Sequence, residues 1–571
     1  MLQKIKSFLA QGNHAQWCVF LLFAFVLFIK CCLFQLMCFH SILISSLWKN
    51  PIEGCLCYLP KLAFSIMIAS VIFITRRKYW TIYFSGILDI WCLANFIYYR
   101  SNEALIDNFA LSMANNMNGF WSSIIFLIYP YDIILFLITL LYGLCFFLID
   151  TRNTSWKFAV IGIFAGYILS LAGQYLYSQK EEYKGWYPLY YEPFSRKVRT
   201  NIDYTEWIRQ TSILHSPACI LVDYYECQNA RNIKMLQTDK MRIESFITNS
   251  TNDKHAHSKY KIIVLLVESF ENWAITPTIM PNLSTFMETH YCLQAPKIKK
   301  QTKAGTSMDG QMILNTGLLP ISEGATCFLF PNNKFPSFAE LMKSVTIIPH
   351  GINSWNQRGM SPAMHFDSTI VRSINDTLLA KTTLDCIHQG YQYVQTVTMA
   401  SHMPFDYGEK HSELCLPSSM PKYMSNYLKS LNCTDAGFKI LFDAFDADSC
   451  LGNTILVITG DHTVFTQENR EEYAAFCKKY DLDYHVNEGF CPLIIYYPQT
   501  QENTQIIDTC YQMDIYPTIL HLIGCEDYYW KGFGVNLMDS IARHNRPISE
   551  QEAYELSDKL IRSNYFANID K

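Results

Sequence analysis

The sequence predicts an N-terminal bundle of five transmembrane helices, followed by an α/β domain with a largely parallel central sheet. The first 180 residues contain five long apolar stretches, and from residue 261 onward short β-branched runs alternate with helix-compatible stretches. Together these patterns predict four parts: a transmembrane domain over residues 1–180, a juxtamembrane connector over 181–260, an α/β domain over 261–545 and a C-terminal tail over 546–571.

The apolar stretches have the length that a bilayer requires. Each has roughly 20 residues or more, enough at a rise of about 1.5 Å per residue to cross about 30 Å of hydrocarbon. A cleavable signal peptide fits poorly, because the stretches recur and no small-residue cleavage site follows the first one. The five predicted spans are Trp17–Phe39, Cys55–Thr75, Tyr79–Tyr99, Trp121–Ile149 and Phe158–Tyr177.

Positive charges in the short flanking segments predict the orientation. Lys4 and Lys6 precede the first span, Arg76–Lys78 lies between the second and third, and Arg152 and Lys157 lie between the fourth and fifth. Lysine and arginine favour the cytoplasmic side, so these segments share it. An odd number of crossings then places everything after about residue 180 in the periplasm or the extracellular space. We therefore expect a multi-pass protein of the cytoplasmic membrane.

Charge and cysteine content narrow the partners and the compartment. The net charge is -4, from 46 basic and 50 acidic residues, so no broad basic field is available and we expect no nucleic-acid partner. Of 20 cysteines, eight lie before residue 150 and twelve after residue 218. That even number is compatible with disulfides in an oxidising compartment, and buried free thiols are the alternative.

Five short apolar runs predict the strands of the sheet. Continuous β-branched runs are typical of strands that are buried on both faces. Ligands of such sheets bind at the carboxyl ends of the strands, so the residues that follow each run are the candidates for chemistry. The runs are Lys261–Val267, Val345–Pro349, Tyr393–Thr398, Thr454–Thr459 and Leu493–Tyr497.

Two of these strand ends carry metal-ligating side chains. Glu268 directly follows the first run, and Asp461 and His462 follow the fourth run after a glycine. Carboxylate and imidazole ligands suit Zn²⁺ or Mn²⁺. A solvated strand terminus and a helix-capping loop are the alternatives for these residues taken singly. Taken together, they predict a site for one divalent cation.

A hydroxyl at a predicted helix start supplies a nucleophile. In the segment Lys303–Gly310, small residues precede Thr306 and Ser307, and an apolar helical run follows. Backbone N–H groups at such a helix start face an anion such as phosphate. A hydroxyl is inert until a metal or a base removes its proton. Thr306 is therefore predicted as the fourth metal ligand and the attacking group; the alternative is that Thr306 or Ser307 only caps the helix.

Histidines follow two further runs. His402, just past the third run, could protonate a leaving alcohol or hold phosphate oxygens. His350 follows the second run and precedes Trp355 and Arg358. An imidazole, an indole and a guanidinium on one loop suit a phosphate that carries a small organic group. The alternative for an isolated loop histidine is a structural or exposed side chain.

These residues form an ordered series that resembles a known family. Val-Glu268-Ser, Gly-Thr306-Ser, Ser-His402-Met-Pro-Phe and Thr-Gly-Asp461-His462 are similar to the lipoteichoic acid synthase type of phosphoglycerol transferase, within the sulfatase and alkaline phosphatase superfamily. The resemblance covers residues 261 to about 540, and five helices before the catalytic domain also match the family's layout. It extends through Met280–Ser284, Cys491–Pro498, Asp514–Leu520 and Gly532–Met538.

The resemblance implies roles for each residue of the series. It implies an alkaline phosphatase-like fold, a covalent phospho-intermediate on Thr306 and one Mn²⁺ ion, with Zn²⁺ used by related phosphoethanolamine transferases. By the same resemblance, the metal ligands are Glu268, Thr306, Asp461 and His462, and the donor-group site is lined by His350, Trp355, Arg358 and His402.

The implied reaction moves a phospho-alcohol group, phosphoglycerol first, from a phospholipid in the membrane to a glycan or lipid acceptor of the cell envelope. The donor would be phosphatidylglycerol or phosphatidylethanolamine. A phosphoethanolamine transferase, a sulfatase-like phosphodiesterase or other hydrolase, and a non-enzymatic sensor or scaffold are the alternatives.

Departures from family patterns bear on these alternatives. Ile352 stands where phosphoglycerol transferases carry an acidic residue, and one extra residue separates Trp355 from Arg358. The start Glu-Ser-x-Arg of lipid A phosphoethanolamine transferases is absent at Glu268. No Cys-x-Pro-x-Arg or Ser-x-Pro-x-Arg segment occurs at the nucleophile, which disfavours a formylglycine sulfatase.

Overall fold

The chain forms two compact units in the computed structural model. Met1–Leu111 and Phe120–Ala230 belong to the first unit, and Ser112–Gly119 and Arg231–Lys571 belong to the second. The residues that the structure describes are 12–39, 51–75, 79–102, 104–112, 121–147, 156–178, 204–229, 235–248, 259–322, 324–349 and 351–568.

Helices occupy the five apolar stretches of the first unit. Two apolar segments, Cys18–Phe39 and Tyr79–Ser101, are long enough to cross a membrane, whereas the apolar segments described in the other three stretches are shorter. These two segments support a membrane region in the first unit, and five membrane crossings stay a prediction. The helices are α2 (Gly12–Phe39), α4 (Pro51–Ile74), α5 (Tyr79–Asn102), α8 (Ile133–Phe147) and α9 (Trp156–Ser178).

The fourth predicted span is not one continuous helix. A short helix, α7 (Trp121–Phe126), ends before Pro130, and α8 begins at Ile133. Proline has no N–H to donate and its ring clashes with the preceding turn, so it interrupts the helix at this point. The prediction of a single helix over Trp121–Ile149 was wrong for this reason.

Charged side chains within the bundle are paired. Lys30 of α2 forms a buried ion pair with Asp89 of α5, and Thr139 of α8 donates a hydrogen bond to the same carboxylate. Arg100 holds both oxygens of Asp132, each at 2.7 Å. Ionised groups are costly in an apolar medium unless they are paired, so these contacts fix neighbouring helices against one another.

The second unit contains a nine-stranded, mostly parallel sheet. Its strand order is β4-β3-β5-β1-β6-β7-β2-β8, with β9 paired to β2. The first five strands in this order are parallel, and β7 runs antiparallel to both β6 and β2. The strands are β1 (Lys261–Val267), β2 (Cys292–Lys299), β3 (Ser344–Pro349), β4 (Ser368–Arg372), β5 (Tyr393–Val397), β6 (Thr454–Gly460), β7 (Cys491–Tyr496), β8 (Thr504–Gln505) and β9 (Cys510–Tyr511). The largely parallel sheet predicted from the apolar runs is confirmed.

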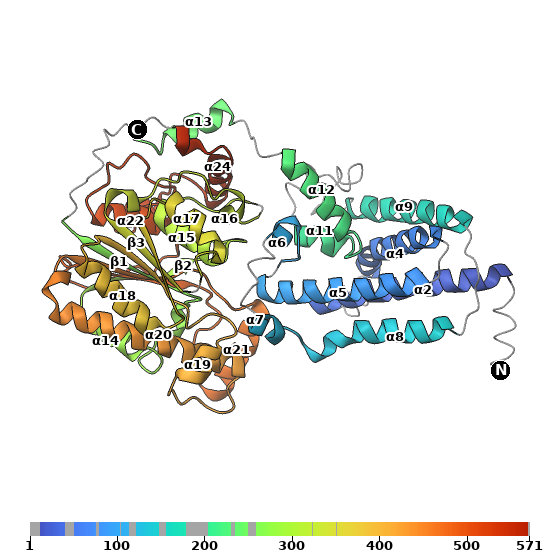
Figure 1. The fold of residues 1–571 in the computed structure, drawn as a ribbon, viewed down its shortest axis with the longest axis horizontal. Coiled ribbons are helices and arrows are strands. Elements are labelled where there is room, and N and C mark those ends of the chain that lie inside the picture. Colours follow the sequence, from blue (N-terminus) through green and yellow to red (C-terminus); the bar gives the residue numbers. More distant parts are fainter. Residues whose placement is uncertain are drawn as a thin grey trace. The chain divides into compact units, whose positions relative to one another are not determined.

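Helices cover both faces of this sheet (Figure 1). Alternate residues of β1 point to opposite faces, so Val264 joins one buried cluster and Leu265 the other. One face is covered by α15 (Thr306–Thr316), α22 (Ile515–Leu522) and α24 (Glu550–Arg562), and the other by α14 (Pro281–Thr289), α18 (Asp376–His388) and α20 (Lys422–Ala447).

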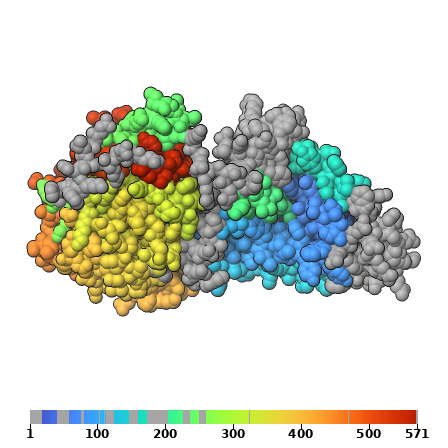
Figure 2. Space-filling view, turned by 45° about the horizontal axis from the view of Figure 1, so that its top comes forward, coloured from blue at the N-terminus to red at the C-terminus, as the bar shows by residue number. Residues whose placement is uncertain are grey.

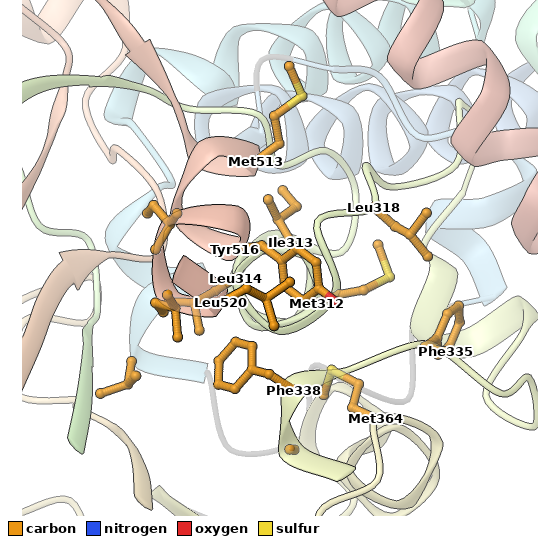
Figure 3. Close-up of a cluster of buried hydrophobic side chains, with 14 of the residues drawn as sticks. Met312, Ile313, Leu314, Leu318, Phe335, Phe338, Met364, Met513, Tyr516 and Leu520 are labelled. Carbon is orange, nitrogen blue, oxygen red and sulfur yellow. The ribbon is translucent and has the colours of Figure 1, made fainter. Parts of the chain in front are cut away.

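The helix that starts at Thr306 is embedded in the core. Figure 3 shows Met312, Ile313 and Leu314 of α15 among Phe338 and Tyr516, and all five side chains are buried. Full burial of an apolar side chain of this size contributes about 1.5–3 kcal/mol. The body of α15 is thus held rigidly, which fixes the position of its first turn.

The last helix also packs into this unit. Residues 546–571, expected as a tail, contain α24, whose Leu556 and Leu560 are buried in the core. Two ion pairs connect α24 to α13 (Gln237–Glu244): Arg242 with Glu552 at 2.8 Å and Lys559 with Asp239 at 2.9 Å. Figure 2 shows the two helices side by side, α13 in green and α24 in red.

Cysteines in the described part of the chain carry free thiols. Among the twelve after residue 218, eight are buried. For these eight cysteines, the structure shows buried free thiols, which was the alternative to disulfides.

Candidate metal centre

Glu268 lies at the carboxyl end of β1 and is held there by the neighbouring strand. Its backbone N–H donates to Thr398 Oγ1 at 3.1 Å, and its carbonyl accepts from Ser401 Oγ at 2.6 Å. Both partners follow β5, which is parallel to β1. The Glu268 side chain is only 4 % exposed, so the carboxylate lies inside the protein and not in solvent.

Asp461 and His462 follow β6 on the other side of β1. The Asp461 N–H donates to the carbonyl of Val267 at 3.1 Å, and Asp461 Oδ1 accepts from the N–H groups of Ser269 and His462 at 2.8 and 2.7 Å. His462 Nδ1 lies 3.1 Å from the carbonyl of Thr463, the geometry of an Nδ1–H donor. The other ring nitrogen, Nε2, lies 3.6 Å from Glu268 Oε1 and 3.5 Å from Asp461 Oδ2.

The three side chains suit a divalent cation. One ligand atom from each of Glu268, Asp461 and His462 lies within 4.8 Å of the others. Asp461 Oδ2 is buried and has no hydrogen-bond partner among the described residues, and a buried polar atom without a partner is costly. Burial first, and then the charge of Glu268, raise the pKa of Asp461 to about 7. A cation held by both carboxylates would offset these two costs.

A glycine allows α15 to approach this group closely. A Cβ at Gly310 would lie 2.8 Å from the carbonyl oxygen and 3.1 Å from the Cα of Asp461. Ser307, three residues earlier, donates through Oγ to Glu268 Oε2 at 3.0 Å, and its Oγ lies 3.4 Å from His462 Nε2. The first turn of α15 therefore lies directly against the three ligands.

Thr306 begins α15 with an unusual backbone conformation. Its φ is 37°, a region that costs a residue with a Cβ about 1–3 kcal/mol. The preceding loop is held by Asp309, whose Oδ2 accepts from the N–H groups of Lys303 and Gly305 at 2.9 and 3.0 Å. The Thr306 side chain is partly exposed. The turn thus places Thr306 directly before Ser307, whose hydroxyl contacts the candidate ligand Glu268; that Thr306 is a metal ligand and the nucleophile stays a prediction.

His402 lies close to the same centre. The segment before it is fixed by buried Asp376, which accepts from the N–H groups of Met399 and Ala400 at 3.0 and 3.4 Å. His402 Nδ1 lies 2.7 Å from the carbonyl of Met403. Burial lowers the pKa of His402 below its ordinary value and outweighs the opposing hydrogen bond to Met403, so the ring is neutral near pH 7.

The predicted donor-group residues are less closely connected to the three ligands. Trp355 has a φ of 48° and packs at 6.2 Å from Phe328, measured between ring centroids. Arg358 is exposed, and its backbone N–H donates to the carbonyl of Ile352. His350 lies outside the described residues. That these residues line a substrate site stays a prediction.

Sequence comparisons match both parts of the chain. The profile of the lipoteichoic acid synthase N-terminal domain matches residues 1–187, and the sulfatase profile matches residues 312–525. The two matches support a lipoteichoic acid synthase-type, sulfatase-like family for this chain. A lipoteichoic acid synthase-like protein of Bacillus subtilis, YvgJ, is 21 % identical over 306 residues, which are 48 % of this chain and 49 % of YvgJ. The chain spans about half the length of the curated relatives it matches.

Two solved structures align with this chain, and the first of them shows a similar fold. The lipooligosaccharide phosphoethanolamine transferase EptA of Neisseria meningitidis aligns with a TM-score of 0.51 and 11 % identity, over 88 % of this chain and 95 % of EptA. The lipoteichoic acid synthase LtaP of Listeria monocytogenes aligns with a TM-score of 0.45 and 17 % identity, over 59 % of this chain and 99 % of LtaP. Superfamily members are metal-dependent, which agrees with the ligand geometry here.

Three contributions to the centre of this sulfatase-like chain were not predicted from its sequence. Ser307 was expected only as a possible cap, yet its hydroxyl contacts Glu268. Asp309 and Gly310 shape the approach of α15, and neither has a ligand-like position in the sequence pattern. The signal for Asp309 and Gly310 is the helical register, because both lie within the first turns of the helix that starts at Thr306.

A buried ion pair supports the turn that carries Asp461 and His462. The Glu271 carboxylate accepts hydrogen bonds from Nη1 and Nη2 of Arg470, at 2.9 and 2.7 Å. It also accepts one from the backbone N–H of Val464 at 3.0 Å. Both charged side chains are buried. The pair therefore ties the loop after β1 to the segment that follows His462.

Replacing Arg470 by methionine is expected to destabilise this unit by about 3–5 kcal/mol, because Glu271 would keep a buried charge without a counterion. The full chain in detergent should unfold at a temperature lower by on the order of 10 °C. Lys439→Met is the matched control, because Lys439 pairs with Asp443 in solvent and such pairs contribute about 1 kcal/mol or less. Equal midpoints for the two variants would contradict the role of the buried pair.

Proposed function

We propose that this protein is a membrane-anchored, metal-dependent transferase that moves phosphoglycerol from a phospholipid to an acceptor of the cell envelope. The observation that carries the proposal is the convergence of Glu268, Asp461 and His462 at the start of α15, with one buried carboxylate oxygen lacking a partner. The lipoteichoic acid synthase domain match and the relatives of that name favour phosphoglycerol as the group transferred.

Two displacements at phosphorus complete the proposed reaction. Thr306 Oγ1 attacks the phosphorus of phosphatidylglycerol, the bond to the diacylglycerol oxygen breaks, and diacylglycerol leaves with a proton. The acceptor hydroxyl then attacks the phosphothreonine, and Thr306 leaves with the proton that the acceptor loses. In-line displacements of this kind depend mainly on positioning and on charge stabilisation.

Each residue has a stated part in this proposal. Glu268, Asp461 and His462 would hold the cation, Mn²⁺ by resemblance and Zn²⁺ as the alternative. When bound, the cation lowers the pKa of the attacking hydroxyl and offsets the charge on the phosphoryl oxygens. The neutral ring of His402 takes or returns a proton through Nε2, since Nδ1 faces the carbonyl of Met403.

The proposed lipid donor also implies that the protein acts at a membrane. The apolar helices of the first unit would keep the second unit at the bilayer surface, where its phospholipid donor lies. On the positive-inside reasoning for the flanking segments, the second unit would lie on the periplasmic or extracellular side, the side on which envelope acceptors are exposed. Accessibility of an engineered cysteine at Lys439 to an impermeant thiol reagent in intact cells would check this orientation.

A headgroup-transfer assay tests the function. The full chain is incubated in vesicles with fluorescent phosphatidylglycerol or phosphatidylethanolamine, with Mn²⁺, Zn²⁺ or a chelator. We expect diacylglycerol release from phosphatidylglycerol with Mn²⁺, and none with the chelator. Preference for phosphatidylethanolamine would identify a phosphoethanolamine transferase, and free glycerol phosphate with no acceptor product would identify a hydrolase. No release from either lipid with either metal would contradict the proposal.

A further inference from the structure

A second group of metal-ligating side chains lies far from the candidate centre in the same unit. His388 is the last residue of α18, Asp448 directly follows α20, and Cys450 lies in the 3-10 turn η7 (Ser449–Leu451). One ligand atom of each lies within 4.8 Å of the others. Since α18 leads into β5 and η7 leads into β6, the group lies at the amino edge of these parallel strands. The Glu268 centre lies at the opposite, carboxyl edge.

The contacts within this group orient the ligand atoms. His388 Nε2 lies 2.6 Å from Asp448 Oδ2, and Asp448 Oδ1 accepts from the N–H of Cys450 at 2.8 Å. One carboxylate oxygen is therefore fixed by the backbone, and the other faces the imidazole. The hydrogen bond from His388, and then that from Cys450, hold the pKa of Asp448 below its ordinary value, so the carboxylate is charged at neutral pH.

The spacing suits a tetrahedral ion after a small adjustment. Zinc bonds of about 2.0–2.3 Å place neighbouring ligand atoms about 3.3–3.8 Å apart. The nitrogen of His388 and the oxygen of Asp448 would have to separate by about 1 Å. The side chains of His388 and Asp448 are 49 % and 25 % exposed, so rotation about their own bonds provides this movement without a change in the core.

The ligand types indicate which metal would bind. A thiol sulfur, an imidazole nitrogen and a carboxylate oxygen favour Zn²⁺, because magnesium, calcium and manganese prefer all-oxygen or oxygen-rich sites. His290 and Asp446 form an ordinary ion pair at 3.1 Å. No thiol belongs to that pair among the described residues. Cys450 is the feature that distinguishes the first group.

We propose that His388, Asp448 and Cys450 bind one divalent cation of the zinc class, with the fourth position open to water. The cation would cross-link the end of α18 to the turn between α20 and β6. This proposal does not depend on the transferase reaction, because it concerns the other edge of the sheet.

Titration with cobalt tests the site. The full chain is purified in detergent under reducing conditions, and Co²⁺ is added as a spectroscopic substitute for zinc. We expect a thiolate-to-cobalt charge-transfer band that reaches its maximum when one Co²⁺ ion is bound at this site. Adding Zn²⁺ should abolish the band. The band should also be absent in Cys450→Ser and in His388→Ala. The matched controls, Cys415→Ser and Asp446→Asn, should keep the band, since Cys415 is exposed but belongs to no such group among the residues that the structure describes.

The outcomes separate this proposal from a simple ion pair. Unfolding temperatures without metal establish that each variant is folded. Absence of the band in a chain whose Cys450 is shown to be reduced by thiol labelling would overturn the site, as would a band that persists in Cys450→Ser. Undiminished binding in His388→Ala would equally overturn it. Loss of transferase activity in the lipid assay would leave the cobalt result unchanged, so the two proposals fail separately.

Discussion

Replacing Thr306 by alanine is expected to lower diacylglycerol release by on the order of 10⁴-fold or more, because no other step replaces a lost nucleophile efficiently. The fold should persist, since the Thr306 side chain is partly exposed and the body of α15 is held by buried apolar residues. Release of fluorescent diacylglycerol measures the effect, and a metal content equal to that of the unsubstituted chain, measured by mass spectrometry, shows that the centre remains assembled.

Ser307→Ala is the comparison for Thr306→Ala, because it removes the neighbouring hydroxyl instead. The Ser307 hydroxyl donates to Glu268 at 3.0 Å, so its loss removes one hydrogen bond to a ligand, and we expect a decrease of about tenfold. Thr306→Ser should retain part of the activity, because it keeps the hydroxyl. An active Thr306→Ala variant together with an inactive Ser307→Ala variant would move the nucleophile to Ser307.

Asp461→Asn is expected to remove both the bound cation and the activity. An asparagine at this position keeps an oxygen for the N–H groups of Ser269 and His462, which Asp461 Oδ1 accepts now. Its amide nitrogen cannot ligate a cation in place of Oδ2. Loss of charge stabilisation worth several kcal/mol corresponds to a decrease on the order of 10³-fold. Metal content and diacylglycerol release are measured on the same preparation.

The unfolding temperature of the metal-free protein provides the control for Asp461→Asn. The two carboxylates of Glu268 and Asp461 repel each other in a buried setting, and this repulsion contributes to the raised pKa of Asp461. Removing one charge should therefore leave the unfolding temperature of the metal-free protein equal or higher. A full metal content in Asp461→Asn would exclude this side chain as a ligand.

The sequence was sufficient to predict the largely parallel sheet and the convergence of Glu268, Asp461 and His462, because both follow from patterns within short segments. Continuous apolar runs specify buried strands, and the residues that follow them must lie at one edge when the strands are parallel. Glu268 and Asp461 follow β1 and β6, which are neighbours in the sheet. Their convergence is thus a consequence of strand order, although strand order itself was not readable from the runs.

What the sequence could not provide depends on packing between distant segments. The contact of Gly310 with Asp461 arises from how α15 sits on the sheet, and the Glu271–Arg470 pair joins residues almost 200 positions apart. A proline in an apolar stretch did not by itself locate the break, because Pro60 lies inside α4 whereas Pro130 lies between α7 and α8. The predicted donor-group residues Trp355 and Arg358 lie in the 3-10 turn η6 (Ser354–Asn356) and in the first turn of α17 (Gln357–Ala363), a local conformation that the sequence pattern did not specify.

The most direct measurement of the central claim is the location of the covalent intermediate. The full chain is mixed with phosphatidylglycerol in the absence of acceptor, quenched with acid and analysed by peptide mass spectrometry, with Mn²⁺ and after its removal by a chelator. A glycerophosphoryl group on Thr306 that forms only when the metal is present is the predicted result. A modified Ser307, or the same modification without metal, would contradict a cation held by Glu268, Asp461 and His462 that makes the Thr306 oxygen reactive.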